Sequence, residues 1–216
     1  MLFETYTDAS THLLRYTLGV LCQSNYGVLS ELVIGGVPVG KLLKKENDAK
    51  ARGPAQDDSK IKYDDHAPAQ QKDYGGRTKD GSILVLIITD APLATHQLKR
   101  LARHATAGLA TVGSSGVGRT FSGDIFLALS TAEHGPEQLN DPKRGRTKPT
   151  ETYTTEVVKN ESIDSYFAAC HEATEEAILN SNVGGRAGAI AMDGTKVDGF
   201  PVAKVKDLLE RYLVKV

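Results

Sequence analysis

The chain has 216 residues, 40% of them hydrophobic, and its 26 basic residues nearly balance 27 acidic ones. That length and apolar content are enough for one globular domain with a core. A net charge of −1 gives no field of one sign, so neither nucleic acid nor an anionic membrane is expected as a partner. The sequence has no apolar run long enough for a transmembrane helix, and its N-terminus carries Glu4 and Asp8 without a basic start. We therefore expect a cytosolic protein without a signal peptide.

The two cysteines, Cys22 and Cys170, lie far apart in the sequence and in apolar surroundings. Neither belongs to a Cys-x-x-Cys pair, so buried free thiols are expected in preference to a disulfide. No cluster of His, Cys, Asp and Glu has the spacing of metal ligands, and we expect no metal or other cofactor.

The first part of the chain predicts two strands followed by a loop. Residues 16–23 (YTLGVLCQ) and 30–36 (SELVIGG) have strand patterns, and the turn between them contains Asn25 and Gly27, which tolerate a left-handed backbone. Residues 44–80 contain few large apolar side chains, alternating charges and two prolines. They cannot bury enough apolar surface to offset the entropy lost on ordering, which predicts a flexible polar loop.

A strand and a helix are predicted next. Residues 82–90 (SILVLIITD) form a continuous apolar, β-branched run, which is typical of a strand covered on both faces. A helix is predicted over 90–113, with Asp90 as N-cap, Pro92 in the first turn and Gly113 at its end. Its apolar face consists of Leu98, Leu101, Ala105 and Leu109.

The remaining elements complete a mixed fold. A glycine-rich loop at 113–124 leads into a second buried strand over 125–131, and residues 152–158 have a weaker strand pattern. Helices are predicted over 162–181 and 201–213. This order of strands and helices predicts an α/β or α+β sandwich in one structural domain.

Gly81 and Ser82 stand where the polar loop meets the buried strand. A serine hydroxyl in that position can attack the preceding carbonyl, and the glycine permits the strained backbone that this attack requires. The new N-terminal serine would have an α-amine with a pKa of about 8, which can act as the base for its own hydroxyl. An ordinary loop-to-strand turn is the commoner interpretation of this spacing, so the residues alone leave both open.

Several segments resemble one family of hydrolases. Residues 80–110 (DGSILVLIITDAPLATHQLKRLARHATAGLA) look like the start of the small subunit of DmpA-type L-aminopeptidase/D-esterases and β-aminopeptidases. Residues 20–27 (VLCQSNYG) and 31–43 (ELVIGGVPVGKLL) resemble the end of the large subunit. Residues 122–131 (SGDIFLALST) and 173–180 (ATEEAILN) resemble later parts of the small subunit. These segments span nearly the whole chain in the order of the family.

The resemblance implies the layered architecture of the N-terminal-nucleophile hydrolases. Residues 1–43 then correspond to the C-terminal part of a large subunit, 44–81 to a loop that ends at the cleavage site, and 82–216 to the catalytic small subunit. The expected cut lies between Gly81 and Ser82. The resemblance also implies a homo-oligomer.

Four residues match the catalytic positions of the family. The resemblance makes Ser82 the nucleophile and Asn25 the oxyanion-stabilising donor, and it gives Ser122 and Asp124 a supporting role in proton transfer. From the residues alone, Asn25 is equally a left-handed turn residue. Ser122 and Asp124 could equally belong to a turn that caps the next strand.

The expected function is therefore a serine aminopeptidase that acts on short peptides, amides or esters. Family precursors carry a large glycine-rich region before the strand that begins near Tyr16, and this chain starts without it. That difference supports a second hypothesis from another class, a catalytically silent scaffold that acts as an assembly or binding subunit. A nucleotide-binding loop at residues 113–118 (GSSGVG) is a weaker third hypothesis, because this segment follows a helix and lacks the Gly-Lys-Ser/Thr ending.

Overall fold

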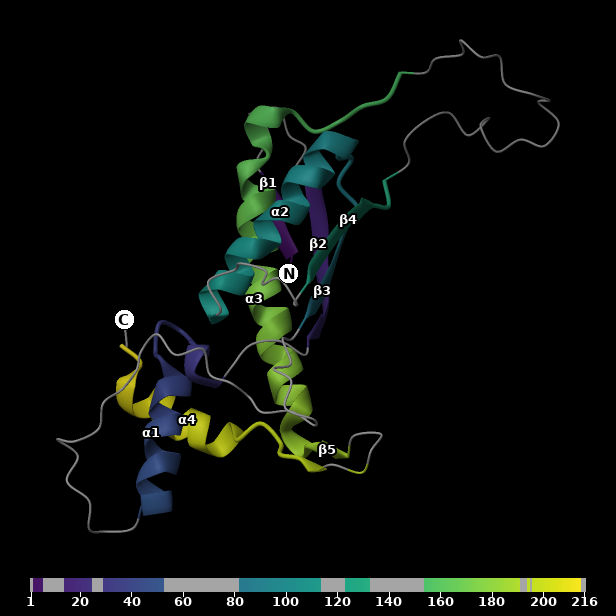
Figure 1. Ribbon diagram of the computed structural model, residues 1–216. Coiled ribbons are helices and arrows are strands. Elements are labelled where there is room, and N and C mark those ends of the chain that lie inside the picture. The colour runs from purple at the N-terminus through teal and green to yellow at the C-terminus, as the bar shows by residue number, and fades with distance from the viewer. Residues whose placement is uncertain are drawn as a thin grey trace.

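A computed structural model describes residues 2–5, 14–24, 29–52, 82–113, 123–132, 154–190, 194 and 196–214. Its main feature is a four-stranded sheet in which β1 (Leu2–Thr5), β2 (Leu14–Ser24), β3 (Ile83–Thr89) and β4 (Asp124–Ser130) lie in that order (Figure 1). The β1–β2 and β2–β3 pairs are antiparallel, and β3 and β4 are parallel. Parallel neighbours need a crossover connection, and the helix between β3 and β4 provides it.

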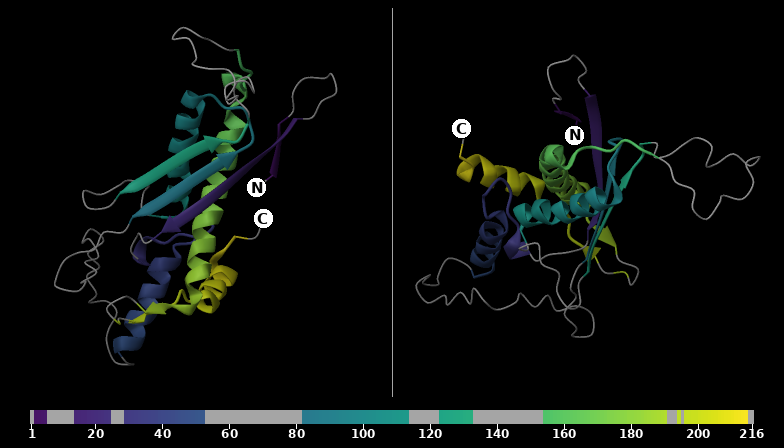
Figure 2. Two further views of the ribbon diagram at one scale, coloured as in Figure 1. Left: turned by 90° about the vertical axis from the view of Figure 1, so that its right-hand side faces the viewer. Right: turned by 90° about the horizontal axis from the view of Figure 1, so that it is seen from above.

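Two long helices cover one face of this sheet. The crossover helix α2 (Thr95–Val112) packs beside α3 (Asp164–Gly184), and both lie on the same side of the strands (Figure 2). The core between the layers contains Leu18, the inward residues of β3, and Leu101, Ala105 and Leu109 of α2. This arrangement confirms the predicted α/β layers and the predicted apolar face of α2.

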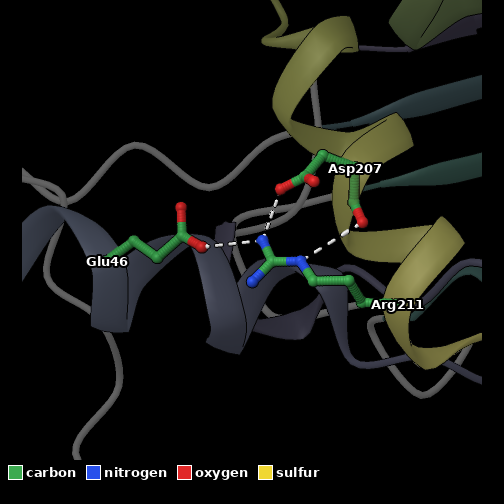
Figure 3. A network of polar contacts seen from close by, with 3 residues as sticks. All are labelled: Glu46, Asp207 and Arg211. Carbon is green, nitrogen blue, oxygen red and sulfur yellow. Dashed lines mark hydrogen bonds and ion pairs between the residues drawn. The ribbon is translucent and has the colours of Figure 1, made fainter.

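A second, smaller core lies between α1 (Val39–Arg52) and α4 (Val202–Tyr212). Its buried residues are Val37, Val39, Leu43, Val205 and Leu208. At the surface, Arg211 of α4 forms ion pairs with Asp207 one turn earlier and with Glu46 of α1, the latter at 3.3 Å (Figure 3).

Helix α1 corrects the predicted start of the polar loop. The helix continues to Arg52, although a loop was expected from residue 44. Val39 and Leu43 anchor its first turns in the small core, and most of the residues that follow are lysine, glutamate, alanine and arginine, which are good helix formers and need no burial of their own. Residues 53–81, the remainder of the predicted loop, lie outside the described residues.

Three other element predictions were wrong. Residues 30–36 form no strand: a short helix, η1 (Leu29–Glu31), is followed by an isolated bridge between Ile34 and Val37. Gly35 and Gly36, with φ of 56° and 78°, turn the chain back between these two residues. Residues 154–158 also lack strand structure.

The third wrong prediction is the start of α2. The helix begins at Thr95 and is not capped by Asp90. The Asp90 carboxylate instead accepts a hydrogen bond from the Thr17 amide at 2.6 Å. Gln97 caps the helix by accepting a hydrogen bond from the Ala94 amide at 2.8 Å. Gly113 ends the helix as predicted, with φ of 122°.

The C-terminal part contains short elements around the two predicted helices. These are η5 (Asn160–Ser162), η6 (Gly185–Ala187), and the small hairpin of β5 (Ala189–Ile190) and β6 (Lys196–Val197). Both cysteines are free, as predicted. Cys170 in α3 is buried as expected, whereas Cys22 in β2 is only half-buried. Burial raises the pKa of the Cys22 thiol and raises that of Cys170 to about 11.

The described residues cover only one face of the sheet. This contradicts the prediction of a strand covered on both faces at 82–90 and of a buried strand at 125–131. Ile83, Val85 and Ile87 are buried under the helices. The alternate residues Leu84 and Ile88 of β3 and Ile125 and Leu127 of β4 are exposed. The apolar run thus places aliphatic side chains on both faces of the strand, and one of those faces has no described covering layer.

Candidate functional site

The end of β2 and the beginnings of β3 and β4 meet at one end of the sheet. Ile83, the first residue of β3, pairs with Ser24 of β2 on one side and with Asp124 of β4 on the other. The pairing follows from the antiparallel register of β2 with β3 and the parallel register of β3 with β4. It brings together three segments that lie far apart in the sequence.

Ser82 occupies the middle of this end, directly before β3. It is exposed, and its Oγ accepts a hydrogen bond from the Gly123 amide at 3.3 Å. The Ile83 amide donates a hydrogen bond to the Gly123 carbonyl at 3.2 Å. Ser82 and Ile83 are therefore both hydrogen-bonded to Gly123, the residue before β4. A hydroxyl held at the rim of a rigid strand is suited to nucleophilic chemistry.

Asp124 begins β4 and is half-buried. Its register partner, Ile83, points into the helix layer, and neighbouring residues in register lie on the same face of a sheet. Asp124 is therefore on the helix side of the sheet, next to the residue that follows Ser82.

Asn25, Gly81 and Ser122 lie outside the described residues. The structure does describe what precedes Asn25: the hydroxyl of Ser24 shares a hydrogen bond with the hydroxyl of Ser181 in α3, at 2.8 Å. This contact ties the end of β2 to the helix layer. Neither Ser181 nor the Gly123 amide was found from the sequence, because a hydroxyl on a helix and a main-chain N–H carry no recognisable pattern.

The opposite end of the parallel pair holds the carboxyl ends of β3 and β4, where α/β sheets often bind ligands. Here Thr89 donates to the Thr17 carbonyl at 2.8 Å, and Ser130 donates to the Ala91 carbonyl at 2.6 Å. Asp90 holds the Thr17 amide. These polar groups stabilise the turn from β3 toward α2.

The two histidines of α2 differ in their surroundings, and only His104 packs between the helices. His104 stacks on Phe167 of α3 with ring centroids 3.8 Å apart, and burial, followed by the nearby Arg100 guanidinium, lowers its pKa. His96 is exposed and lies 3.4 Å from Asn160. Within the described part of the chain, no group of three or more His, Cys, Asp and Glu residues could hold a metal ion, and no helix could span a membrane.

Comparisons with known proteins identify the family. The sequence profile described as peptidase family S58 matches residues 7–195. The chain belongs to peptidase family S58. The β-peptidyl aminopeptidase BapA of Sphingosinicella microcystinivorans is 33% identical to it over 197 residues, which is 91% of this chain but 44% of that protein.

Solved structures of aminopeptidases share the fold of this S58 chain. A β-aminopeptidase of Burkholderia sp. has a TM-score of 0.64 at 35% identity, over 93% of this chain and 46% of its own. The L-aminopeptidase D-Ala-esterase/amidase of Ochrobactrum anthropi, a serine aminopeptidase whose fold is a variant of the Ntn-hydrolase fold, has a TM-score of 0.62 at 31% identity, over 92% and 44%. The chain thus has an Ntn-hydrolase-type fold and spans less than half the length of these relatives.

Proposed function

We propose that this chain is a self-processing serine aminopeptidase in which Ser82 is the nucleophile. The observation that carries the proposal is the position of Ser82: it precedes the central strand β3, and its Oγ is held by the Gly123 amide at 3.3 Å. Family membership is consistent with a catalytic role for Ser82, because the family match covers residues 7–195 and therefore includes this serine.

The first step is cleavage between Gly81 and Ser82. The Ser82 Oγ attacks the Gly81 carbonyl carbon, the C–N bond breaks, and the acyl group moves to oxygen as an ester. Water then hydrolyses the ester, which leaves a carboxylate on Gly81 and a free α-amine on Ser82. Glycine at position 81 suits this step because it adopts strained backbone conformations at little cost.

The second step is hydrolysis of a substrate. The freed amine accepts the proton of the Ser82 hydroxyl while the oxygen attacks the substrate carbonyl, and it returns the proton to the leaving amine. Water then releases the acyl group. Asn25 donates a hydrogen bond to the developing oxyanion, and Ser122 and Asp124 hold the Ser82 amine in position for proton transfer.

The substrates proposed are short peptides, amides and esters, from which an N-terminal residue is removed. The relatives are named β-aminopeptidases and an L-aminopeptidase D-Ala-esterase/amidase. A substrate panel for this chain should therefore contain N-terminal α-, β- and D-residues. We further propose that the protein is cytosolic and assembles as a homo-oligomer.

The mass of the purified chain tests the first step without any knowledge of the substrate. We expect two fragments, with the second beginning at Ser82. Ser82→Ala should stay whole and lose hydrolysis of the panel, because it lacks the hydroxyl that is proposed to form the ester. Ser82→Cys should retain some cleavage, since a thiol can make the same attack.

The matched control is Ser165→Ala, which removes an exposed hydroxyl on α3 that bonds the Ser162 carbonyl at 3.4 Å. This variant should be cut like the wild type. A wild-type chain that stays whole, or a Ser82→Ala chain that is cut at the same bond, contradicts the proposal.

A catalytically silent scaffold is the second candidate, and what favours it is that the exposed Ser82 directly before β3, with its Oγ bonded to the Gly123 amide, is also explained by an ordinary loop-to-strand turn. It predicts a folded wild-type chain that is neither cut nor active on the panel. The mass measurement and the panel therefore separate the two candidates.

A further inference from the structure

A pair of hydroxyls holds the end of β2 to the helix layer at the candidate site. Ser24 is the last residue of β2, and its Oγ lies 2.8 Å from the Oγ of Ser181 in the last turn of α3. The hydrogen bond spans 157 positions, so it joins the part of the chain before the proposed cut to the part after it. Ser24 is also the register partner of Ile83, which directly follows Ser82. The hydroxyl pair therefore acts on a strand end that is paired beside Ser82.

Apolar burial holds this end of β2 only weakly. The residues of β2 that face the helices are Leu18, Val20, Cys22 and Ser24, because alternate residues of a strand share a face. Leu18 is fully buried, whereas the other three are half-buried. The neighbouring strand β3 is fixed from its first residue, since Ile83 is 1% exposed. The end of β2 thus depends more on polar contacts than the start of β3 does.

Ser181 lies on a part of α3 that is fixed in the main core. Ile178, three residues earlier on the helix, is 1% exposed and belongs to that core. The Gly185 amide closes the last turn by donating to the Ser181 carbonyl. The hydroxyl that reaches Ser24 is therefore presented by a rigid helix, which places a side chain more precisely than a loop does.

Ser24 has a second contact, and it stays within β2. The Ser24 hydroxyl also bonds the Cys22 thiol, whose pKa is raised by burial and lowered by this bond. Because Cys22 and Ser24 belong to the same strand, their contact cannot tie that strand to a helix. Of these two contacts, the bond to Ser181 is the one that joins β2 to α3.

We propose that Ser181 is a positioning residue for the reaction at Ser82, because its hydroxyl fixes the end of β2 that pairs beside the nucleophile. This inference rests on the proposed function. Ser181 acts through Ser24 and forms no covalent bond in the reaction. Asn25, the proposed oxyanion donor, directly follows Ser24 in the chain, so a shift of Ser24 would be passed to the main chain that leads to this donor. Small displacements of groups that must align with reacting atoms lower the rate.

The rate of self-cleavage during cell-free synthesis of the full chain tests the proposal, because the chain is its own substrate. Ser181→Thr and Ser181→Val form a matched pair, since their side chains have nearly the same shape and only threonine keeps a hydroxyl. We expect Ser181→Thr to be cut at nearly the wild-type rate. Ser181→Val and Ser181→Ala should be cut about 2- to 10-fold more slowly, the range that corresponds to one neutral hydrogen bond. A general packing defect would slow the threonine and valine variants alike.

Hydrolysis separates positioning from substrate binding. For the panel substrates that the wild type hydrolyses, Ser181→Val should lower kcat by a similar factor and leave KM unchanged, because the lost contact matters only as the reacting groups align. Ser165→Ala, which removes another hydroxyl of α3, is the control and should match the wild type in both rates.

A double variant tests whether Ser181 acts through Ser24. Ser24→Ala and Ser181→Ala remove the same hydrogen bond, so the chain with both changes should be cut no more slowly than the slower single variant. Rate factors that multiply in the double variant overturn the inference, and so do equal rates for Ser181→Thr and Ser181→Val. In both cases the proposed function stands, because the wild type is cut. A wild-type chain that stays whole overturns the proposed function, and the positioning role falls with it.

Discussion

At Gly108 the backbone of α2 lies against α3 with no room for a methyl group. A Cβ at this position would be 2.5 Å from the His171 carbonyl oxygen and 2.7 Å from the Thr174 Cβ. The two helices can pack this closely only because the side chain is absent. Gly108 therefore permits the short distance between α2 and α3 in the layer that covers the sheet.

We expect Gly108→Ala to destabilise the protein. The methyl group would force the helices apart, and overpacking of a buried site costs about 1–3 kcal/mol. Gly184→Ala is the matched control, since Gly184 ends α3 with helical φ and nothing within 4 Å of its Cβ position. Urea unfolding of both variants measures the difference. Equal free energies of unfolding would show that the helix contact is not tight.

Cys170 makes the stability depend on pH in the alkaline range. Burial raises the pKa of its thiol from 9.0 to about 11, so between these values the unfolded chain loses a proton that the folded chain keeps. The stabilisation is therefore complete below pH 9 and is lost as the pH rises toward 11. By about pH 10.5 the loss should be about 2 kcal/mol. The free energy of unfolding of wild type minus that of Cys170→Ala should fall by this amount from about pH 8, whereas a constant difference would contradict the shift.

At the candidate site, residue chemistry alone predicted little. Gly81 and Ser82, at the junction of the polar loop and the buried strand, suggested a nucleophile, but a simple turn explained the same spacing. Asn25, Ser122 and Asp124 came from the family resemblance, because a turn asparagine and a Ser-Gly-Asp loop have no pattern that distinguishes catalysis from capping. The strand register that sets Ser82 beside Gly123 depends on pairing across distant segments, which one sequence does not show.

At the scale of elements, α4 is held by a small core. Val205 and Leu208 are its buried residues, and they pack with Val37, Val39 and Leu43. The Arg211 ion pairs with Asp207 and Glu46 lie at the surface, where they contribute little to stability (Figure 3). Val205 and Leu208 are thus the main anchors of α4, and the partly buried Phe200 and Leu209 pack against the same cluster.

Leu208→Ala should release α4 from α1. The leucine is 1% exposed, and loss of a buried leucine costs about 2–5 kcal/mol. Because the two cores share no buried residue and only the partly buried Leu32 packs against both, we expect faster amide exchange in α4 and α1 while β3 and α2 remain protected. Arg211→Ala is the control and should leave exchange nearly unchanged. Uniformly faster exchange after Leu208→Ala would mean that both cores unfold together.

The elements that were predicted well have strong periodic patterns, and those that were missed depend on the rest of the fold. Leu101, Ala105 and Leu109 repeat at helical spacing, and α2 buries them. The run at 82–90 correctly predicted a strand, but its apolar residues cannot show what covers each face. The apolar stretch at 30–36 lacks strand alternation, and its glycines at 35 and 36 make a turn.

At the scale of the whole molecule, the two sides of the proposed cut are interleaved. The part before the proposed cut contributes β2, which lies between β1 and β3 in the sheet, and α1, which packs on α4. Seven register pairs join β2 to β3, from Leu18 with Thr89 to Ser24 with Ile83. Both cores therefore contain residues from before and after Ser82.

A cut anywhere in residues 53–81 should consequently leave the fragments associated. Separation would break the β2–β3 ladder and expose Leu18, Val85 and Ile87, which are fully buried. The composition of this segment predicts that trypsin cuts there first, so the experiment does not require self-cleavage. Gel filtration should give one peak with both fragments in native buffer and two peaks in concentrated guanidinium chloride. Fragments that separate in native buffer would show that the β2–β3 ladder and the two cores do not hold the halves together. Early cuts within β3 or α2, in contrast, would contradict the predicted loop.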